Sequence, residues 1–171
     1  MGEWDFNPDE KRKVPMVQGG TCFASGEMNP YGLKMQFYAD EKKIFSRLNV
    51  AEYMHSWKGM VHGGIVATIL DATMFWGAMY FLKCIALTRN ATIELSKAAK
   101  MNEMPFTAVG EIKSRETNTN AMMRASLYNN TGALCAATTA NFTTITSDMA
   151  RRLELITEDD LIAVNHLFDV F

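Results

Sequence analysis

The sequence feature that most constrains the fold is a long apolar stretch from Val61 to Lys83, VHGGIVATILDATMFWGAMYFLK. In a helix drawn through this stretch, apolar residues lie on every side, and Asp71 is the only charged residue between Gly63 and Leu82. A helix that is hydrophobic all round is buried, either in a protein core or in a membrane. The stretch is long enough for either environment.

Asp71 helps to separate these two environments. An ionisable group at the middle of a bilayer is costly and rare, and the chain on both sides of the stretch is polar, so a core helix is favoured. Burying an unpaired carboxylate in a core is also costly, so Asp71 must meet water, hydrogen-bond donors or a ligand. It is therefore the first functional candidate, and the alternative is a structural hydrogen bond within its own core.

The start of the predicted helix is the second candidate. His62, Gly63 and Gly64 can present bare backbone N–H groups at a helix N-terminus, where unpaired donors and the helix dipole favour an oxyanion or a carbonyl oxygen. Glycine also allows a ligand to approach the backbone closely. The alternative is a tight turn that leads into the helix and binds nothing.

The spacing of the two candidates leads to a prediction about assembly. Gly63 and Asp71 are eight residues apart, which is about 12 Å along a helix and too far for both to touch one carbonyl group. Two such helices packed antiparallel across a twofold axis place Gly63 of one beside Asp71 of the other, twice. The sequence therefore predicts a homo-oligomer whose site lies between subunits.

The same residues carry a resemblance to a known family. In HGGIVATILDA, the His62-Gly63-Gly64 triplet is followed by Asp71 nine positions after the histidine, and this resembles the central helix of hotdog-fold acyl-CoA thioesterases. The resemblance is to the phenylacetate-pathway (PaaI-like) type in the 4-hydroxybenzoyl-CoA thioesterase superfamily. It covers residues 22–145, where CFASGEMNPYGL is similar to the entry segment of some members. It implies an α+β fold with an antiparallel sheet curled around one helix.

The resemblance also implies roles for individual residues. The N–H groups of Gly63 or Gly64 would polarise the carbonyl of an acyl-CoA thioester across a dimer interface. Asp71 of the other chain would act as general base or as nucleophile, and the sequence does not choose between these roles. His62 would orient the loop or the substrate. The family assembles as a dimer or a dimer of dimers, and coenzyme A enters only as part of the substrate.

Substrate-binding residues follow from the same resemblance. Ser56 stands where relatives often have an amide residue, and Thr88 stands where they often have a hydroxyl that holds the attacking water. Lys97 and Arg124 are candidate partners for the phosphates of coenzyme A. The chain departs from relatives at Ser96-Lys97, in place of a proline, and at 117–120, in place of a Gly-Arg turn. These departures leave open whether the thiol carrier is coenzyme A.

Composition and pattern divide the chain into three parts. We expect a polar N-terminal arm at 1–20, anchored by Trp4 and Phe6, a hotdog domain at 21–146 and a C-terminal helical extension at 147–171. Period-two alternation predicts strands at 33–38, 42–48, 88–95, 106–114, 122–129 and 133–145, the last four forming a meander, with a hairpin turn at 129–132. Thr157 is expected to cap a final helix.

Charge and cysteine content exclude several classes of partner and cofactor. A net charge of −2 and the lack of a dense basic run argue against nucleic acid, and the charged first twenty residues do not read as a signal peptide. The three histidines are too dispersed to suggest a metal site. Three scattered cysteines fit neither a disulfide framework nor a metal site, so we expect a cytoplasmic protein with no metal and no membrane partner.

Two other functions are compatible with the fold. A hotdog protein can bind an acyl ligand without turnover, in which case Asp71 is dispensable. A hydratase or dehydratase of this fold pairs a histidine with a carboxylate at other spacings, which His62 does not match. Phe75, Trp76 and the 13 methionines are compatible with an adaptable apolar pocket, so the acyl group stays open among short, long and aryl chains.

Overall fold

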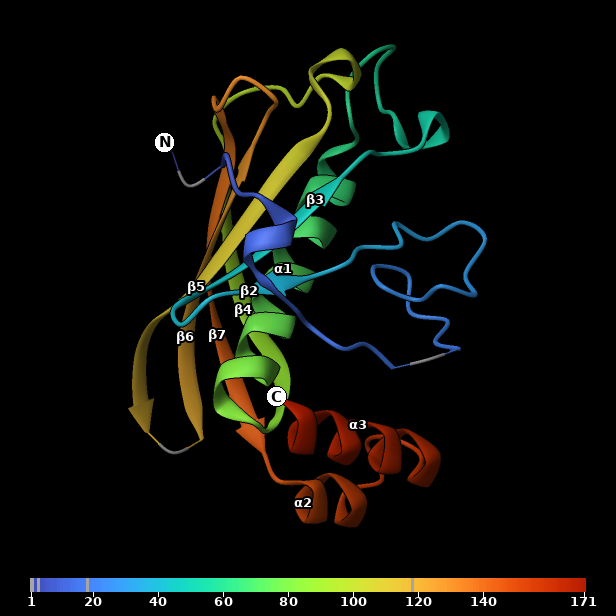
Figure 1. Ribbon diagram of the computed structural model, residues 1–171, viewed down its shortest axis with the longest axis vertical. Coiled ribbons are helices and arrows are strands. Elements are labelled where there is room, and N and C mark those ends of the chain that lie inside the picture. The colour runs from blue at the N-terminus through green and yellow to red at the C-terminus, as the bar shows by residue number, and fades with distance from the viewer. Residues whose placement is uncertain (1, 3, 18, 118) are drawn as a thin grey trace.

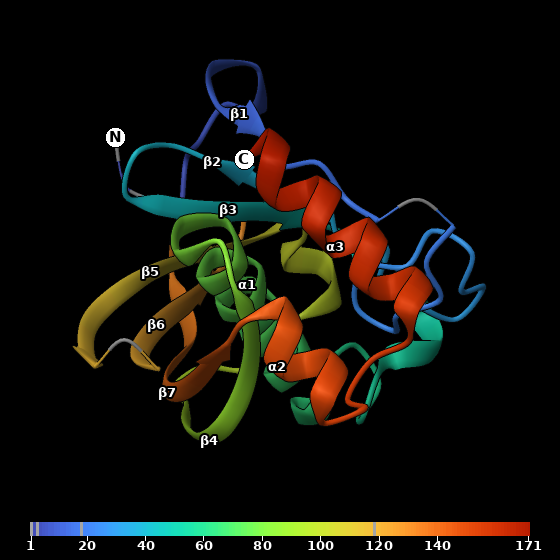
Figure 2. The ribbon, with the colours of Figure 1, turned by 90° about the horizontal axis from the view of Figure 1, so that it is seen from below.

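The computed structural model describes residues 2, 4–17, 19–117 and 119–171. An antiparallel sheet of seven strands curls around the long helix α1 (Gly63–Leu82), and two further helices lie at one end (Figures 1 and 2). This is the predicted hotdog arrangement. In chain order the strands are β1 (Arg12–Lys13), β2 (Tyr38–Ala39), β3 (Lys43–Leu48), β4 (Ile85–Leu95), β5 (Phe106–Thr117), β6 (Asn120–Tyr128) and β7 (Leu134–Ile145). Their order in the sheet is β1-β2-β3-β5-β6-β7-β4.

Helix α1 is the core of the molecule. Its length and composition would suit a membrane span, but Ile69, Leu70 and Ala78 have no exposed surface because the sheet wraps around them. Two glycines allow the helix and sheet to come close. A Cβ atom at Gly77 of α1 would lie 2.9 Å from Ile44, and one at Gly110 of β5 would lie 3.0 Å from Ile44 and from Thr73. The core-helix prediction is confirmed.

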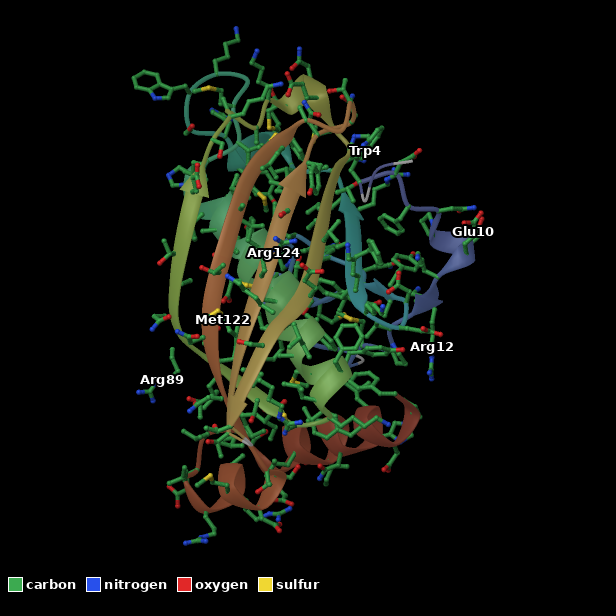
Figure 3. All side chains as sticks on the ribbon, turned by 90° about the vertical axis from the view of Figure 1, so that its left-hand side faces the viewer. Trp4, Glu10, Arg12, Arg89, Met122 and Arg124 are labelled. Carbon is green, nitrogen blue, oxygen red and sulfur yellow. The ribbon has the colours of Figure 1, made fainter. Side chains whose placement is uncertain are left out.

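The strands follow the expected alternation of buried and exposed side chains. Along β6, Ala121, Met123, Ala125 and Leu127 are buried against the core. Their neighbours Met122 and Arg124 lie on the outer face of the sheet (Figure 3).

Two sequence expectations about strands were wrong. Only the end of the predicted strand at 33–38 enters the sheet. Lys34 has a φ of 51°, which breaks an extended strand, and the backbone hydrogen bonds of 33–37 run to irregular chain at Phe23, Ala24 and Val14. The four-strand meander is also broken. β5, β6 and β7 are consecutive, whereas β4 lies at the far edge beside β7, because α1 crosses the concave face before β4 begins.

The N-terminal and C-terminal parts both join the main body. Phe6 packs on Phe45 and Val109, and β1 adds a short strand at one edge of the sheet. Helix α2 (Ser147–Arg152) and helix α3 (Glu158–Val170) follow β7, and Thr157 caps α3 as predicted by accepting a hydrogen bond from the Asp160 N–H. Three short 3₁₀ helices lie in the connecting segments, at Pro8–Glu10, Glu52–Met54 and Met101–Glu103.

Candidate active site

Asp71 and Thr88, both predicted from sequence, meet in the structure. Asp71 lies half-buried at the middle of α1, and the Thr88 hydroxyl on β4 donates a hydrogen bond of 2.9 Å to Asp71 Oδ1. In the described part of the chain this is the only hydrogen bond to the carboxylate, so Oδ2 has no partner. Thr88 thus fixes the orientation of an acid whose second oxygen is available for chemistry.

The start of α1 is held by its own histidine. His62 is the N-cap, and its Nδ1 atom accepts a hydrogen bond of 2.9 Å from the Gly64 N–H. The His62 carbonyl accepts from the next two amides, Ile65 and Val66. Within the described ranges nothing accepts from the Gly63 N–H. Of the two glycines that the sequence proposed as donors, only Gly63 therefore has a free N–H at the helix N-terminus.

Gly63 lines a pocket of about 210 Å³. Ser56 and Lys97, both predicted substrate-binding residues, line the same pocket. The remaining wall is largely apolar and consists of Met60, Val61, Val66, Leu95, Ala98, Ala99 and Cys135. A concave, mostly apolar pocket with a few polar groups is the usual form of a small-molecule site.

Two loops beyond the sheet shape this pocket. The Cys135 carbonyl accepts hydrogen bonds of 3.0 Å from both Ser96 and Lys97, which ties the pocket loop to β7. Glu103 accepts a hydrogen bond of 2.7 Å from the buried Asn129 side chain and lies 4.0 Å from the Lys97 ammonium. The hairpin turn after β6 therefore holds the loop that carries the candidate cation.

Cys135 contributes an uncharged wall. Burial raises the pKa of its thiol above the ordinary value and the Glu103 carboxylate raises it further, against a smaller opposing effect of Lys97. A raised pKa keeps the thiol protonated at neutral pH, and the thiolate is the nucleophilic form of cysteine. All three cysteines of the chain are free.

Other predicted residues lie away from the pocket. Arg124 is on the outer face of the sheet, where its guanidinium pairs with Glu111 at 2.7 Å (Figure 3). Asp71 is about 12 Å along α1 from Gly63 and does not line the Gly63 pocket. Over the described ranges, no three His, Cys, Asp or Glu side chains come together as a possible metal site.

A β-bulge on β4 brings the two halves of the candidate site to one face. Thr88 pairs with Phe142 and Asn90 with Asn141, so Arg89 is an extra residue on β4. The bulge reverses the alternation, and Thr88 and Leu95, seven residues apart, both point to the helix side. Thr88 then reaches Asp71, and Leu95 lies beside Gly63, where an added Cβ would be 3.4 Å away.

Strand β4 has one free edge. It is the last strand of the sheet, and its residues from Leu87 to Leu95 are all exposed, including Ala91 and Ile93 on the side that faces the helix. In Figure 3 the Arg89 side chain extends beyond this edge. A long exposed edge strand with apolar side chains is a surface that pairs with another chain.

Sequence comparisons give no relative: no family model and no curated protein matches the chain. Structure comparisons find chains of the same fold. The thioesterase superfamily protein RHA08564 has a TM-score of 0.65 at 17% identity, covering 78% of this chain and 66% of that one. A hypothetical thioesterase from Streptococcus pneumoniae with coenzyme A has a TM-score of 0.56 at 19% identity, covering 62% of this chain and 83% of that one. The Escherichia coli PaaI protein has a TM-score of 0.57 at 14% identity, covering 66% of this chain and 80% of that one. These likenesses establish the hotdog fold.

Proposed function

We propose that the protein hydrolyses an acyl-CoA or related thioester to a free acid and a thiol, at a site shared by two copies of the chain. The observation that carries the proposal is the pairing of a free Gly63 N–H in an apolar pocket with an Asp71 carboxylate oriented by Thr88. The two groups lie on the same helix, too far apart to act on one carbonyl. A second copy supplies the missing half of each site.

The reaction uses each group in turn. The thioester carbonyl accepts a hydrogen bond from the Gly63 N–H, and the helix N-terminus stabilises negative charge on that oxygen. With Asp71 as general base, water attacks the carbonyl carbon while its proton passes to the carboxylate. The C–S bond then breaks, and Asp71 returns the proton to the departing thiolate. With Asp71 as nucleophile, a carboxylate oxygen attacks the carbonyl carbon, the C–S bond breaks and the thiolate leaves, and water then hydrolyses the acyl anhydride to the free acid and the Asp71 carboxylate.

The free edge of β4 supports a specific mode of pairing. An antiparallel pair of β4 strands with Thr92 near the twofold axis keeps helix-facing residues opposite one another. Ala91 then lies opposite Ile93 of the second copy, and beyond the bulge Thr88 lies opposite Leu95. Arg89 comes near Glu94 of the second copy, so the edge is also complementary in charge. This register brings each Asp71–Thr88 pair toward the partner's Gly63 pocket, in a dimer or a dimer of dimers.

The choice of thiol carrier has two supports. The streptococcal neighbour is a structure with coenzyme A, and the pocket mouth of this chain carries Lys97. The Lys97 ammonium is half-exposed and 4.0 Å from Glu103, a distance at which it can still turn toward a phosphate. Three free cysteines favour a reducing cytoplasm as the site of the activity.

One substitution tests the role of the carboxylate. Asp71→Asn keeps the shape of the side chain but removes the base, so release of thiol from a panel of acyl-CoA esters should fall at least about a hundredfold. Asp148→Asn, at an exposed position on α2, is the matched control and should retain native rates. Equal rates in native protein and Asp71→Asn would refute the catalytic claim. Binding of acyl-CoA without turnover on any ester would make the chain a non-catalytic acyl-binding protein.

A further inference from the structure

A second, larger groove lies at the start of α1. It has a volume of about 530 Å³, within the usual range for ligand sites, and it includes Gly64 and His62, whereas the first pocket includes Gly63. Its other lining residues are Phe23, Tyr31, Tyr53, Met54, His55, Ile65 and Thr68. The proposed hydrolysis gives no role to the aromatic residues or to His55.

Three aromatic rings are exposed in this groove. Phe23, Tyr31 and Tyr53 are 42%, 69% and 59% exposed, although rings of this size usually lie more deeply buried. The two tyrosine rings meet edge to face, with centroids 6.4 Å apart and planes at 82°. A large part of each ring is therefore accessible to a flat ligand. Clustered exposed apolar side chains are typical of a binding surface.

Two histidines in the groove are fixed as opposite tautomers. His55 Nδ1 lies 2.5 Å from the Glu52 carbonyl oxygen, which can only accept, so Nδ1 carries the proton and Nε2 is an acceptor when the ring is neutral. His62 Nδ1 accepts from the Gly64 N–H, so its Nε2 carries the proton and is a donor.

The backbone brings these two residues close together. The Met54 carbonyl accepts a hydrogen bond of 3.0 Å from the His62 N–H, and His55 pairs with Val61 in an antiparallel bridge. The residues that line the groove therefore include one acceptor nitrogen, one donor nitrogen and three exposed aromatic rings. That combination matches a flat heteroaromatic ring with an amino group next to a ring nitrogen.

We propose that this groove binds the adenine ring of the thiol carrier, an inference that rests on the proposed function. The adenine amino group donates to His55 Nε2, a ring nitrogen accepts from His62 Nε2–H, and the ring stacks on Tyr31 or Tyr53. Stacking of a base on an aromatic side chain is tolerant of ring identity and contributes substantially to binding. The pantetheine amides also combine a donor and an acceptor, but they lack the ring that three aromatic side chains would contact.

Calorimetric titration of the full-length protein tests this assignment with two probes, CoA and 4′-phosphopantetheine, which lacks the nucleotide. Tyr53→Ala should weaken CoA binding about tenfold, the effect of losing one base–aromatic stack, and leave phosphopantetheine binding unchanged. Trp57→Ala is the matched control, because Trp57 is 77% exposed in the same loop but does not line the groove. It should bind both probes as the native protein does.

The outcomes separate this proposal from the hydrolysis. An equal loss of both probes in Tyr53→Ala would place the pantetheine amides in the groove and overturn the adenine assignment, as would no loss of either. Turnover adds an independent readout: Tyr53→Ala should raise KM for acyl-CoA with little change in kcat. Adenine-dependent binding without any turnover would keep the groove assignment and refute hydrolysis. Turnover with an unchanged KM in Tyr53→Ala would support hydrolysis and refute the groove assignment.

Discussion

The beginning and the middle of α1 differ in what they offer to a substrate. At its beginning the helix has a free Gly63 N–H in an apolar pocket, and at its middle it has a half-buried Asp71 held by Thr88. The first place can stabilise developing negative charge, and the second can move a proton or attack a carbon. Neither place can do both, and about 12 Å of helix separates them. The proposal that each place is half of a site shared by two copies rests on this difference.

A variant at the free edge of β4 should separate the half-sites most completely. Ile93 is 37% exposed on the helix-facing side, and in the proposed pairing it is buried against the second copy. Ile93→Asp should therefore keep the fold of each chain but prevent association and lower turnover at least about a hundredfold, because no site retains both groups. Sedimentation and thiol-release assays measure the two effects.

The control for this variant is Ile162→Asp on α3, where the native side chain is 62% exposed and is not part of the β4 edge. It should associate and turn over as the native protein does. A monomeric Ile93→Asp with native turnover would show that one chain contains a complete site.

The two glycines at the helix start should respond differently to alanine. A Cβ at Gly63 meets only Leu95, at an ordinary 3.4 Å, so Gly63→Ala should keep or slightly raise stability while its methyl group narrows the pocket and lowers turnover about tenfold. A Cβ at Gly64 lies 3.1 Å from His62 Nδ1. Gly64→Ala should therefore disturb the cap and cost about 0.5–2 kcal/mol of unfolding free energy.

Thermal unfolding and thiol-release kinetics distinguish the pair. Loss of stability without loss of turnover in Gly63→Ala would contradict the role given to the Gly63 amide. Loss of turnover without loss of stability in Gly64→Ala would contradict the role given to the Gly64 amide. The contrast sharpens the comparison, because the two residues are adjacent and chemically identical.

The sequence could indicate the candidate groups of the two proposed half-sites because each depends on local pattern. The apolar stretch from Gly63 to Leu82 has one acid, and its spacing from the glycines limits what a single helix can do. The strand preference of β3, β5, β6 and β7 likewise follows from alternation over six or more residues. Thr88 was chosen by resemblance as a residue that would hold the attacking water; the structure shows its hydroxyl bonded to Asp71, and the role toward water stays a prediction.

Long-range features could not be predicted in the same way. The run Leu87 to Leu95 reads as one regular strand, and no residue in it marks Arg89 as a bulge, yet only the bulge puts Thr88 and Leu95 on one face. Cys135 reaches the pocket from β7 through hydrogen bonds to Ser96 and Lys97, partners that no sequence pattern connects. The capping role of His62 depends on its side-chain rotamer, which spacing does not determine.

Mixing two inactive variants tests the central claim most directly. Asp71→Asn retains the Gly63 pocket, and Gly63→Val, which crowds that pocket, retains the carboxylate. In a mixed dimer one of the two shared sites is intact, so an equal mixture after subunit exchange should regain about a quarter of native turnover. If each chain carried a complete site of its own, every chain in the mixture would hold one lesion. Turnover that stays at the level of the separate variants, in a mixture shown to contain mixed dimers, would contradict the account.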